Sequence, residues 1–311
     1  MHPLLRATAA VSAAGALGLG YASLVERNAY VLRRFRVPVL PPGHRPITVV
    51  HLSDLHLMPD QRRKVAWVRS LADLQPDLVV NTGDNISHPS SVAVALEAFD
   101  AFAGIPGVFV LGSNDYFAPK PKNPLLYLTP QFARGTGTSR RLPTKDLVAG
   151  LLDLGWTDLT NSRTVLDVAG SPLELIGVDD PHLGYDRYEL VEGPADPRAV
   201  LTVGVTHAPY QHVLDAMARD RARLLIAGHT HGGQLCVPFV GALVTNCDLD
   251  TGRAKGLSRW WPGAGRSVGM PPPDDAAYLE VSAGLGTSPY APVRFACRPE
   301  ATLLTLVAAD A

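Results

Sequence analysis

Short apolar segments alternate with helical patterns along this chain, and this alternation constrains its fold more than any other feature. Residues 47–53 (ITVVHLS), 77–82 (DLVVNT) and 107–111 (GVFVL) are β-rich runs, each followed by an aspartate or a glycine. Between them, residues 61–74 and 90–103 have helical patterns. This β-α-β-α-β order predicts a sheet with parallel strands that is covered by helices, and therefore an α/β fold.

The rest of the chain continues the alternation with weaker strand patterns. Helices are expected over residues 144–154 and 210–219. Further strands are expected at TVLDV (164–168), LELIGV (173–178), LTVGVTH (201–207), RLLIAGH (223–229), AYLEVSAGLG (277–286) and ATLLTLVA (301–308). Segments near 117–143 and 252–275 contain many glycine, proline and polar residues, so we expect them to be loop insertions.

Composition narrows the possible functions. The chain has 311 residues, of which 46% are hydrophobic, and a formal net charge of −1. This is enough for a buried core, while the near-zero charge argues against nucleic-acid binding as the main activity. The three cysteines are widely spaced and form no CxxC pair. They indicate ordinary thiols and argue against a disulfide framework or a structural zinc site.

The N-terminal segment differs from the rest of the chain. Ala7 to Val25 is an uncharged run of 19 residues, close to the length that spans a bilayer as a helix. Arginines follow this run at positions 27, 33, 34 and 36, which favours an anchor with the following domain on the cytoplasmic face. A cleaved signal peptide, and hence secretion, is the alternative. We therefore expect an anchor and a proline-rich connector over residues 1–45, and one domain over residues 46–311.

Polar side chains that can bind metals follow several of the expected strands. They are Asp54 and His56, Asp84 and Asn85, Ser113 with Asn114 and Asp115, His207, and His229 with His231. Each one alone could be a helix cap, a turn residue or a core histidine. Because functional sites of open α/β sheets lie at the carboxyl ends of the strands, we expect these residues to converge. Together they predict a metal site.

The Asp54-x-His56 and His229-x-His231 pairs strengthen this prediction. Residues i and i+2 of an extended segment point to the same side, so each pair could bind one ion. Mixed oxygen and nitrogen ligands suit Mn, Fe, Zn or Ni better than Mg or Ca.

The order of these blocks resembles that of the calcineurin-like metallophosphoesterases, over Ile47 to about Val307. More narrowly, the apolar leader and GHTHGGQ (228–234) resemble a membrane-associated bacterial branch related to UDP-2,3-diacylglucosamine hydrolases. The resemblance implies a four-layer αββα sandwich with a centre for two divalent metal ions.

The resemblance also implies a ligand set. Asp54, His56 and His231 would hold one ion, Asp84 would bridge both ions, and His207, His229 and an amide oxygen from Asn114 would hold the second. In such a centre a metal-bridged hydroxide attacks phosphorus while the cations neutralise the developing charge.

One turn departs from the family pattern. The family usually has Gly-Asn-His-Asp, whereas this chain has Gly112-Ser113-Asn114-Asp115. If the two motifs are aligned without a gap, Ser113 takes the position of the ligand asparagine and Asn114 that of the catalytic histidine. If the alignment is shifted by one residue, Asn114 is the ligand and Asp115 lies near the missing imidazole. We prefer Asn114, because a carboxamide oxygen is a better ligand than a hydroxyl. Lacking that histidine, the chain should favour leaving groups that need little protonation, such as those of a phosphate anhydride.

The sequence therefore predicts a membrane-associated, dinuclear-metal hydrolase of the phosphodiesterase or pyrophosphatase kind, with Asp84, Asn114 and Asp115 as catalytic residues. The expected substrate is a phosphorylated small molecule, a nucleotide diphosphate or a lipid-linked diphosphate, and no nucleic acid is expected. The alternative is a catalytically silent domain that binds a phosphorylated ligand or a partner. A β-lactamase-like metallohydrolase would need a His-x-His-x-Asp-His block, which HTHGGQL (229–235) lacks. A membrane structural protein with incidental polar residues does not explain the ordered blocks.

Overall fold

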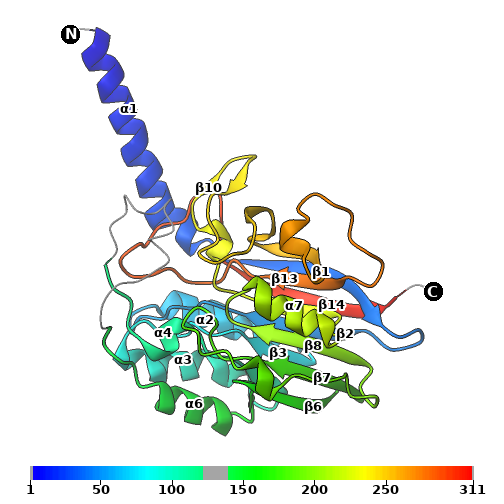
Figure 1. Ribbon diagram of the computed structural model, residues 1–311. Coiled ribbons are helices and arrows are strands. Elements are labelled where there is room, and N and C mark those ends of the chain that lie inside the picture. Colours follow the sequence, from blue (N-terminus) through cyan, green and yellow to red (C-terminus); the bar gives the residue numbers. More distant parts are fainter. Residues whose placement is uncertain (1–2, 122–138, 310–311) are drawn as a thin grey trace.

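The expected β-α-β-α-β unit is present in the computed structural model, which describes residues 3–121 and 139–309. Strands β2 (Ile47–Leu52), β3 (Leu78–Asn81) and β4 (Gly107–Phe109) pair in parallel. Helix α2 (Arg62–Ser70) connects the first two strands and α3 (Val92–Phe99) the next two (Figure 1).

The first sheet is completed by strands from both ends of the domain, in the order β1-β14-β2-β3-β4-β5. β5 (Thr157–Asp158) pairs with β4, and β14 (Glu300–Ala308) runs antiparallel to β2. β1 (Val31–Leu40) pairs in parallel with β14, and its last residues, 37–40, belong to the segment that we expected to be a proline-rich connector. Pro38 is tolerated because β1 is an edge strand, and the pairing register shifts between Pro38 and Leu40.

The second sheet has the order β12-β13-β9-β8-β7-β6. Its strands are β6 (Ser162–Val168), β7 (Ser171–Gly177), β8 (Leu201–Thr206), β9 (Leu224–Ala227), β12 (Gly256–Trp260) and β13 (Ala277–Val281). β12 lies inside the segment that we expected to be a loop near 252–275. It pairs antiparallel with β13, buries Trp260, and stacks Arg259 over the ring of Tyr278. These contacts involve residues far apart in sequence, so local periodicity did not indicate the strand.

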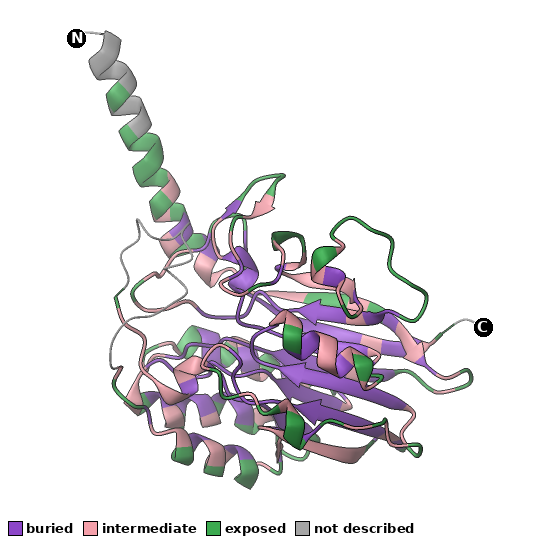
Figure 2. Ribbon diagram, viewed as in Figure 1, coloured by how far each residue is buried: buried purple, intermediate pink, exposed green. Residues whose placement is uncertain are grey.

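Apolar cores join the layers and confirm the four-layer arrangement. One core lies between the two sheets and includes Val49 and Val203. A second joins the first sheet to α2, α3 and α6 (Thr144–Asp153), and a third joins the second sheet to α7 (Gln211–Arg219). Figure 2 shows the resulting pattern: the strands are buried, and the helices expose their outer faces.

Shorter elements complete the described chain. α4 (Ser113–Tyr116) follows β4, and β10 (Cys236–Val237) forms a hairpin with β11 (Gly241–Ala242). Short 3-10 helices span Leu71–Leu74, Pro89–Ser91, Asp100–Phe102, Tyr188–Leu190, His231–Gly233, Thr251–Arg253 and Ala264–Arg266. Residues 122–138, most of the first expected insertion, lie outside the described residues.

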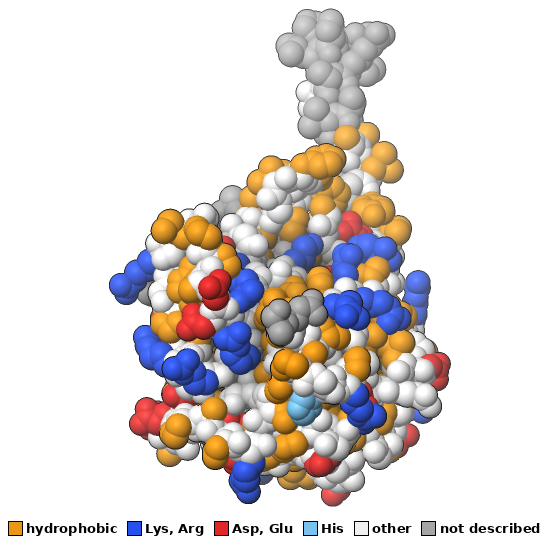
Figure 3. Space-filling view, turned by 90° about the vertical axis from the view of Figure 1, so that its right-hand side faces the viewer, with side chains coloured by type: hydrophobic (Ala, Val, Ile, Leu, Met, Phe, Trp, Pro, Cys, Tyr) orange, Lys and Arg blue, Asp and Glu red, His pale blue; other side chains and the backbone are white. Residues whose placement is uncertain are grey.

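Helix α1 (Pro3–Gly20) projects from the body of the molecule and continues into a π-helical turn (Tyr21–Val25) and a 3-10 turn (Glu26–Asn28) (Figure 1). Leu17 of α1 and Leu24 of the π-helical turn are exposed, and Figure 3 shows hydrophobic side chains where this segment meets the body of the molecule. In the part of the chain that the structure describes, no helix is both long enough and apolar enough to cross a membrane. The expected anchor over residues 7–25 is therefore not supported.

Candidate metal centre

The ends of β2, β3, β8 and β9 bring the predicted ligands together. Asp54 and His56 follow β2, Asp84 follows β3, His207 follows β8, and His229 and His231 follow β9. All six side chains are buried, with at most 9% of each residue exposed. Strands β2 and β3, and likewise β8 and β9, are parallel neighbours, so their carboxyl ends lie at the same edge of each sheet.

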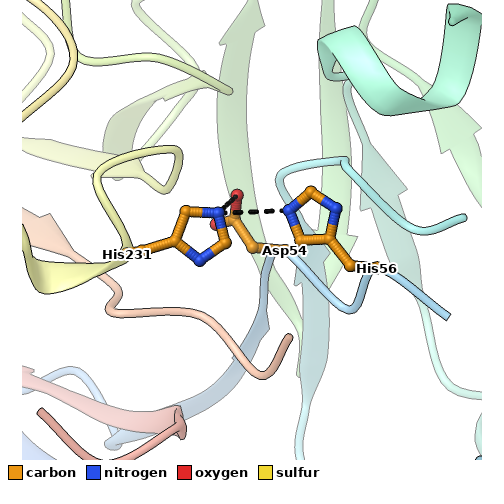
Figure 4. Close-up of side chains that lie close together, drawn as sticks. All are labelled: Asp54, His56 and His231. Carbon is orange, nitrogen blue, oxygen red and sulfur yellow. Dashed lines mark hydrogen bonds and ion pairs between the residues drawn. The ribbon is translucent and has the colours of Figure 1, made fainter. Parts of the chain in front are cut away.

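Asp54, His56 and His231 form the first group of ligands. One potential ligand atom from each residue lies within 4.8 Å of those of the other two. The Nε2 atoms of the histidines are 3.1 Å apart, and His231 Nε2 lies 3.6 Å from Asp54 Oδ1. Figure 4 shows the side chains pointing toward one another from two separate loops. Burial lowers the pKa of both histidines, which favours the neutral imidazoles that can bind a metal.

Asp54, Asp84 and His207 form a second group with the same 4.8 Å spacing. Asp84 also faces the first group, because its Oδ2 is 3.4 Å from His56 Nε2, while its Oδ1 is 3.6 Å from His207 Nε2. Burial alone would raise the pKa of Asp84, but His207 and His56 hold it below its usual range. Burial alone would lower the pKa of His207, yet Asp84 and Asp180 raise it to about 9.

The hydrogen bonds of Asp54 and His207 leave one atom of each directed at the centre. Asp54 Oδ2 accepts bonds from Ser53 Oγ at 2.5 Å and from the amide of His229 at 3.0 Å. His207 Nδ1 donates to the carbonyl oxygen of Thr82 at 2.7 Å, so Nε2 is the ring nitrogen that would bind a cation, which would displace the proton that the raised pKa retains. Asp54 Oδ1 and His207 Nε2 are buried and have no hydrogen-bond partner within the described residues. These two unpaired atoms fit a bound divalent cation, because such a cation accepts carboxylate oxygens and neutral imidazole nitrogens.

Several of the candidate ligands have a left-handed backbone. The φ angles are 50° at Asp54, 43° at His56, 56° at Asp84, 68° at His229 and 50° at His231. Such values are uncommon for residues other than glycine, and they cluster where function requires them. Here they turn the chain sharply at the strand ends, which directs the side chains inward.

These turns alter the expected pairing of His229 with His231. The extended-chain rule predicts that both point to one ion, but only His231 lies in the first group. The ring centroid of His229 is 5.2 Å from that of His207 and 4.6 Å from that of His182. The rule fails because β9 ends at Ala227 and the backbone is not extended beyond it.

The Gly112–Asp115 turn places Asn114 beside Asp84 and Ser113 beside Asp180. The backbone amide of Asn114 donates to Asp84 Oδ1 at 2.6 Å, and its side-chain Nδ2 donates to Asp84 Oδ2 at 2.8 Å. Ser113 Oγ donates instead to Asp180 Oδ2 at 2.5 Å. Asn114 is thus the residue of this turn that contacts the centre through Asp84.

Asp115, which we expected near the missing imidazole, has its carboxylate directed at backbone amides. It is fully buried, and its carboxylate accepts hydrogen bonds from the amides of Gly112, Asp84 and Asn85 at 2.8–3.0 Å. Burial and the nearby Asp84 raise its pKa to about 7. These hydrogen bonds connect the Gly112–Asp115 turn to the loop that carries Asp84.

The loop after β7 contributes residues that the sequence analysis missed. Asp180 is buried, and burial raises its pKa to about 6. It accepts hydrogen bonds from Ser113 and from the amide of His182. His182 Nδ1 lies 3.1 Å from the hydroxyl of Tyr210. The signal was present, since the polar run DDPH (179–182) follows an expected strand as the other candidate residues do.

Glycines allow the loops to approach this closely. A Cβ atom on Gly228 would collide with Ser53 Oγ and Asp54 Oδ2. One on Gly112 would collide with Asp84 Oδ1 and with the ring of His207. Only glycine fits at these contacts without moving the candidate ligands.

Comparisons with known proteins give matches over most of the chain. A family model described as calcineurin-like phosphoesterase matches residues 47–233. The uncharacterized metallophosphoesterase YkuE of Bacillus subtilis (strain 168) is 27% identical over 315 residues, covering 94% of this chain and 93% of that protein. The phosphodiesterase YaeI of Escherichia coli (strain K12) is 28% identical over 309 residues, covering 97% of each chain.

A solved structure, that of TT1561 of Thermus thermophilus, is also similar. It has a TM-score of 0.40 at 12% identity and covers 78% of this chain and 91% of its own. The narrower resemblance to UDP-2,3-diacylglucosamine hydrolases is not shown by these matches.

Proposed function

Since this chain belongs to the calcineurin-like phosphoesterase family, we propose that it uses two divalent cations to cleave a phosphoester or a phosphate anhydride. Membership of that family, with a relative named as a phosphodiesterase, makes it a metal-dependent phosphoester hydrolase. The number of ions, the ligand roles and the substrate are our proposal.

The position of Asp84 is the observation that carries the two-ion proposal. Each of its carboxylate oxygens faces a different histidine, His56 at 3.4 Å and His207 at 3.6 Å. A carboxylate in this position can bridge two cations. Asp54, His56 and His231 would hold one ion, and His207, His229 and Asn114 would hold the other. The mixture of oxygen and nitrogen ligands favours Mn, Fe, Zn or Ni.

Bound cations would supply an acidified water and neutralise charge on the phosphoryl oxygens. The protein's own contribution is to hold the ligands before substrate arrives. Asn114 fixes both oxygens of Asp84, and Thr82 fixes the tautomer of His207. Because Nδ2 of Asn114 donates to Asp84, Oδ1 is the acceptor left on that carboxamide for an ion.

The missing histidine of the Gly112–Asp115 turn bears on the substrate. Residues 112–115 contain no imidazole that could protonate a leaving group. We therefore propose a leaving group that is already a weak base, as in a nucleotide-diphosphate or lipid-linked diphosphate. Comparable kcat/KM values for a simple dialkyl phosphodiester and a diphosphate ester would contradict this preference. The expected attachment to a membrane rests on the leader sequence alone, and the residues of the centre do not bear on it.

The altered turn also favours one alternative, a catalytically silent domain that binds a phosphorylated ligand. Metal binding without turnover of any phosphoester would support this alternative. Turnover that requires the metal ligands would exclude it.

The decisive experiment measures metal content and hydrolysis of bis(p-nitrophenyl) phosphate, with and without Mn²⁺. The wild type should contain close to two ions per chain and hydrolyse the substrate. Asp84→Asn should lose at least about 100-fold in activity, since the bridging charge is removed. Asp73→Asn, an exposed aspartate on the Leu71–Leu74 turn, is the matched control and should be unchanged. If the wild type binds no metal at all, the proposal is wrong.

A further inference from the structure

A cationic pocket lies beside the metal centre, and the proposed reaction does not use it. It has a volume of about 270 Å³, near the lower end of ligand-pocket volumes of roughly 300 Å³. The turn after α1, the start of α2 and a loop before β14 form its wall. The lining residues are Arg27, Asn28, Tyr30, Asp60, Gln61, Arg62, Arg63, Lys64, Leu285, Gly286 and Thr287.

Positive charge in this pocket exceeds negative charge. Arg27, Arg62, Arg63 and Lys64 face a single carboxylate, that of Asp60. Arg62 is compensated from outside by Glu97 at 2.9 Å. Across residues 3–121 and 139–309, no ion pair is formed by Arg27, Arg63 or Lys64. The pocket therefore has cations without counter-ions.

Arg63 is exposed, but burial makes the charge of Lys64 and, in part, that of Arg27 unfavourable. Lys64 is only 4% exposed, and its Nζ donates to the carbonyl oxygen of Leu55 at 2.6 Å. Burial, together with the neighbouring Arg294 and Arg27, lowers the pKa of Lys64 to about 7. Arg27 Nε is buried and has no partner in the described structure. A buried cation costs free energy unless it is paired, so a bound anion would stabilise this arrangement.

Arg294 adds to the positive potential from behind the pocket. It is fully buried, and its Nη2 donates to the carbonyl oxygens of Ala283, Gly284 and Gly286 at 2.7–3.0 Å. Within the described chain it has no carboxylate partner. Helix α2 also begins at this wall, and the positive end of its dipole favours an anion.

We propose that this pocket binds a phosphate group through Arg27, Arg63 and Lys64. Guanidinium groups bind the several oxygens of a phosphate in paired hydrogen bonds, and an ammonium adds a point charge. Asn28, Gln61 and Thr287 provide further polar groups on the same wall. The phosphate could belong to a lipid head group or to a soluble molecule.

The pocket is separate from the metal centre but shares a loop with it. The amide of Gly286 donates to the carbonyl oxygen of Asp54 at 2.6 Å, and Lys64 contacts Leu55 as described. The pocket thus lies against the backbone of the loop that carries Asp54 and His56. The exposed Leu24 and Val25 precede Arg27, so an apolar surface lies close by in the chain. The proposal does not depend on whether the centre hydrolyses a substrate.

Binding of inorganic phosphate to the full-length protein tests the proposal by calorimetry, with Mn²⁺ and again after chelation. Chelation removes the ions that would bind phosphate at the centre, so any binding that remains reports on the pocket. The double variant Arg27→Gln/Arg63→Gln should lose at least about 10-fold in this affinity, since two charge-assisted contacts are removed. Arg34→Gln, an exposed arginine on β1 outside the pocket, should bind as the wild type does.

A second arm identifies the source of the phosphate. Flotation with vesicles of phosphatidylcholine, with and without phosphatidic acid, measures binding to a lipid head group. A loss of phosphatidic-acid binding in the double variant assigns the pocket to lipids, and a loss of inorganic-phosphate binding alone assigns it to soluble molecules. If the double variant matches Arg34→Gln in both arms, the proposal is overturned. Unchanged hydrolysis of bis(p-nitrophenyl) phosphate by the double variant would show that its fold and metal centre are intact. If neither the wild type nor the variants hydrolyse this substrate, calorimetry still measures phosphate affinity at the pocket.

Discussion

The Nε2 atoms of His56 and His231 lie 3.1 Å apart in a buried site. Burial lowers the pKa of both side chains, so both are neutral near pH 7. Two facing imidazole nitrogens can share only one proton, and Asp54 Oδ1 beside them has no hydrogen-bond partner among the described residues. A divalent cation would satisfy all three atoms together.

Removal of metal should therefore destabilise the fold. In the metal-free protein, Asp54 and Asp84 are buried carboxylates close to each other, and a cation stabilises their charges. A cation present at 100 times its Kd adds about 2.7 kcal/mol to the free energy of unfolding. We expect EDTA to lower Tm by several degrees and Mn²⁺ or Zn²⁺ to restore it. An identical Tm with and without chelator, at several metal concentrations, would contradict a metal bound by the native state.

Replacement of Asn114 and of Ser113 should have unequal effects. Asn114→Ala removes the side-chain hydrogen bond to Asp84 Oδ2 and the carboxamide oxygen, while the backbone amide still donates to Asp84 Oδ1, so activity should fall by about 10- to 100-fold and metal affinity should weaken. Ser113→Ala removes a contact to Asp180 and should change activity much less. Metal content and kcat/KM measured on both variants decide between the two alignments of the turn. A larger effect of Ser113→Ala would make Ser113 the ligand.

Gly228→Ala should disrupt the centre through the backbone of the β9 loop. The added methyl group would collide with Ser53 Oγ and Asp54 Oδ2. Such overpacking costs about 1–3 kcal/mol, and it displaces the Asp54 carboxylate from His231. Urea unfolding and metal titration should both show a loss. In Gly18→Ala the new Cβ meets no atom within 4 Å, so this control should match the wild type.

The ion pair between Arg163 and Glu174 should make stability depend on pH. Arg163 Nε donates to Glu174 Oε1 at 2.7 Å, and Thr202 donates to Oε2 at the same distance. Burial alone would raise the pKa of Glu174, but these hydrogen bonds lower it below 4.5. Because the folded state holds the ionised form, the contribution is complete above pH 4.5 and is lost as the pH falls through the lowered pKa.

Glu174→Gln should therefore cost about 1.5–3 kcal/mol at pH 7 and less at pH 3. Urea unfolding at both pH values measures the difference from the wild type. Glu189 forms an exposed ion pair with Arg187 at 3.7 Å, so Glu189→Gln should lower the free energy of unfolding only slightly at either pH. A cost for Glu174→Gln that does not vary with pH would show that packing, rather than charge, holds the residue.

The sequence was sufficient to predict the central parallel strands, and to select polar residues at their ends, for a common physical reason. Buried parallel strands appear as short apolar runs, and their carboxyl ends meet at one edge. A polar residue directly after such a run is therefore placed near the others without knowledge of the contacts. Asp54, His56, Asp84 and His207 follow this rule, and the structure brings them together.

Edge strands and long-range contacts were less predictable. β1 contains Pro38 and three arginines, so it does not look like a strand until β14 provides its partner. The separation of His231, which lies beside His56, from His229, which lies beside His207 and His182, depends on left-handed turns after β9. Asp115 looked like a reactive group, but its three backbone contacts come from loops that only the fold brings together.

The sequence by itself determined the alternation of strands and helices, and with it the edge at which a metal centre could form, because periodicity and strand-end chemistry are local properties of the chain. Only the tertiary structure decided which candidate ligands lie close together, which carboxylate holds the Gly112–Asp115 turn, and where Arg27, Arg63 and Lys64 converge. Those outcomes depend on distances between residues that are remote in sequence, and packing sets such distances.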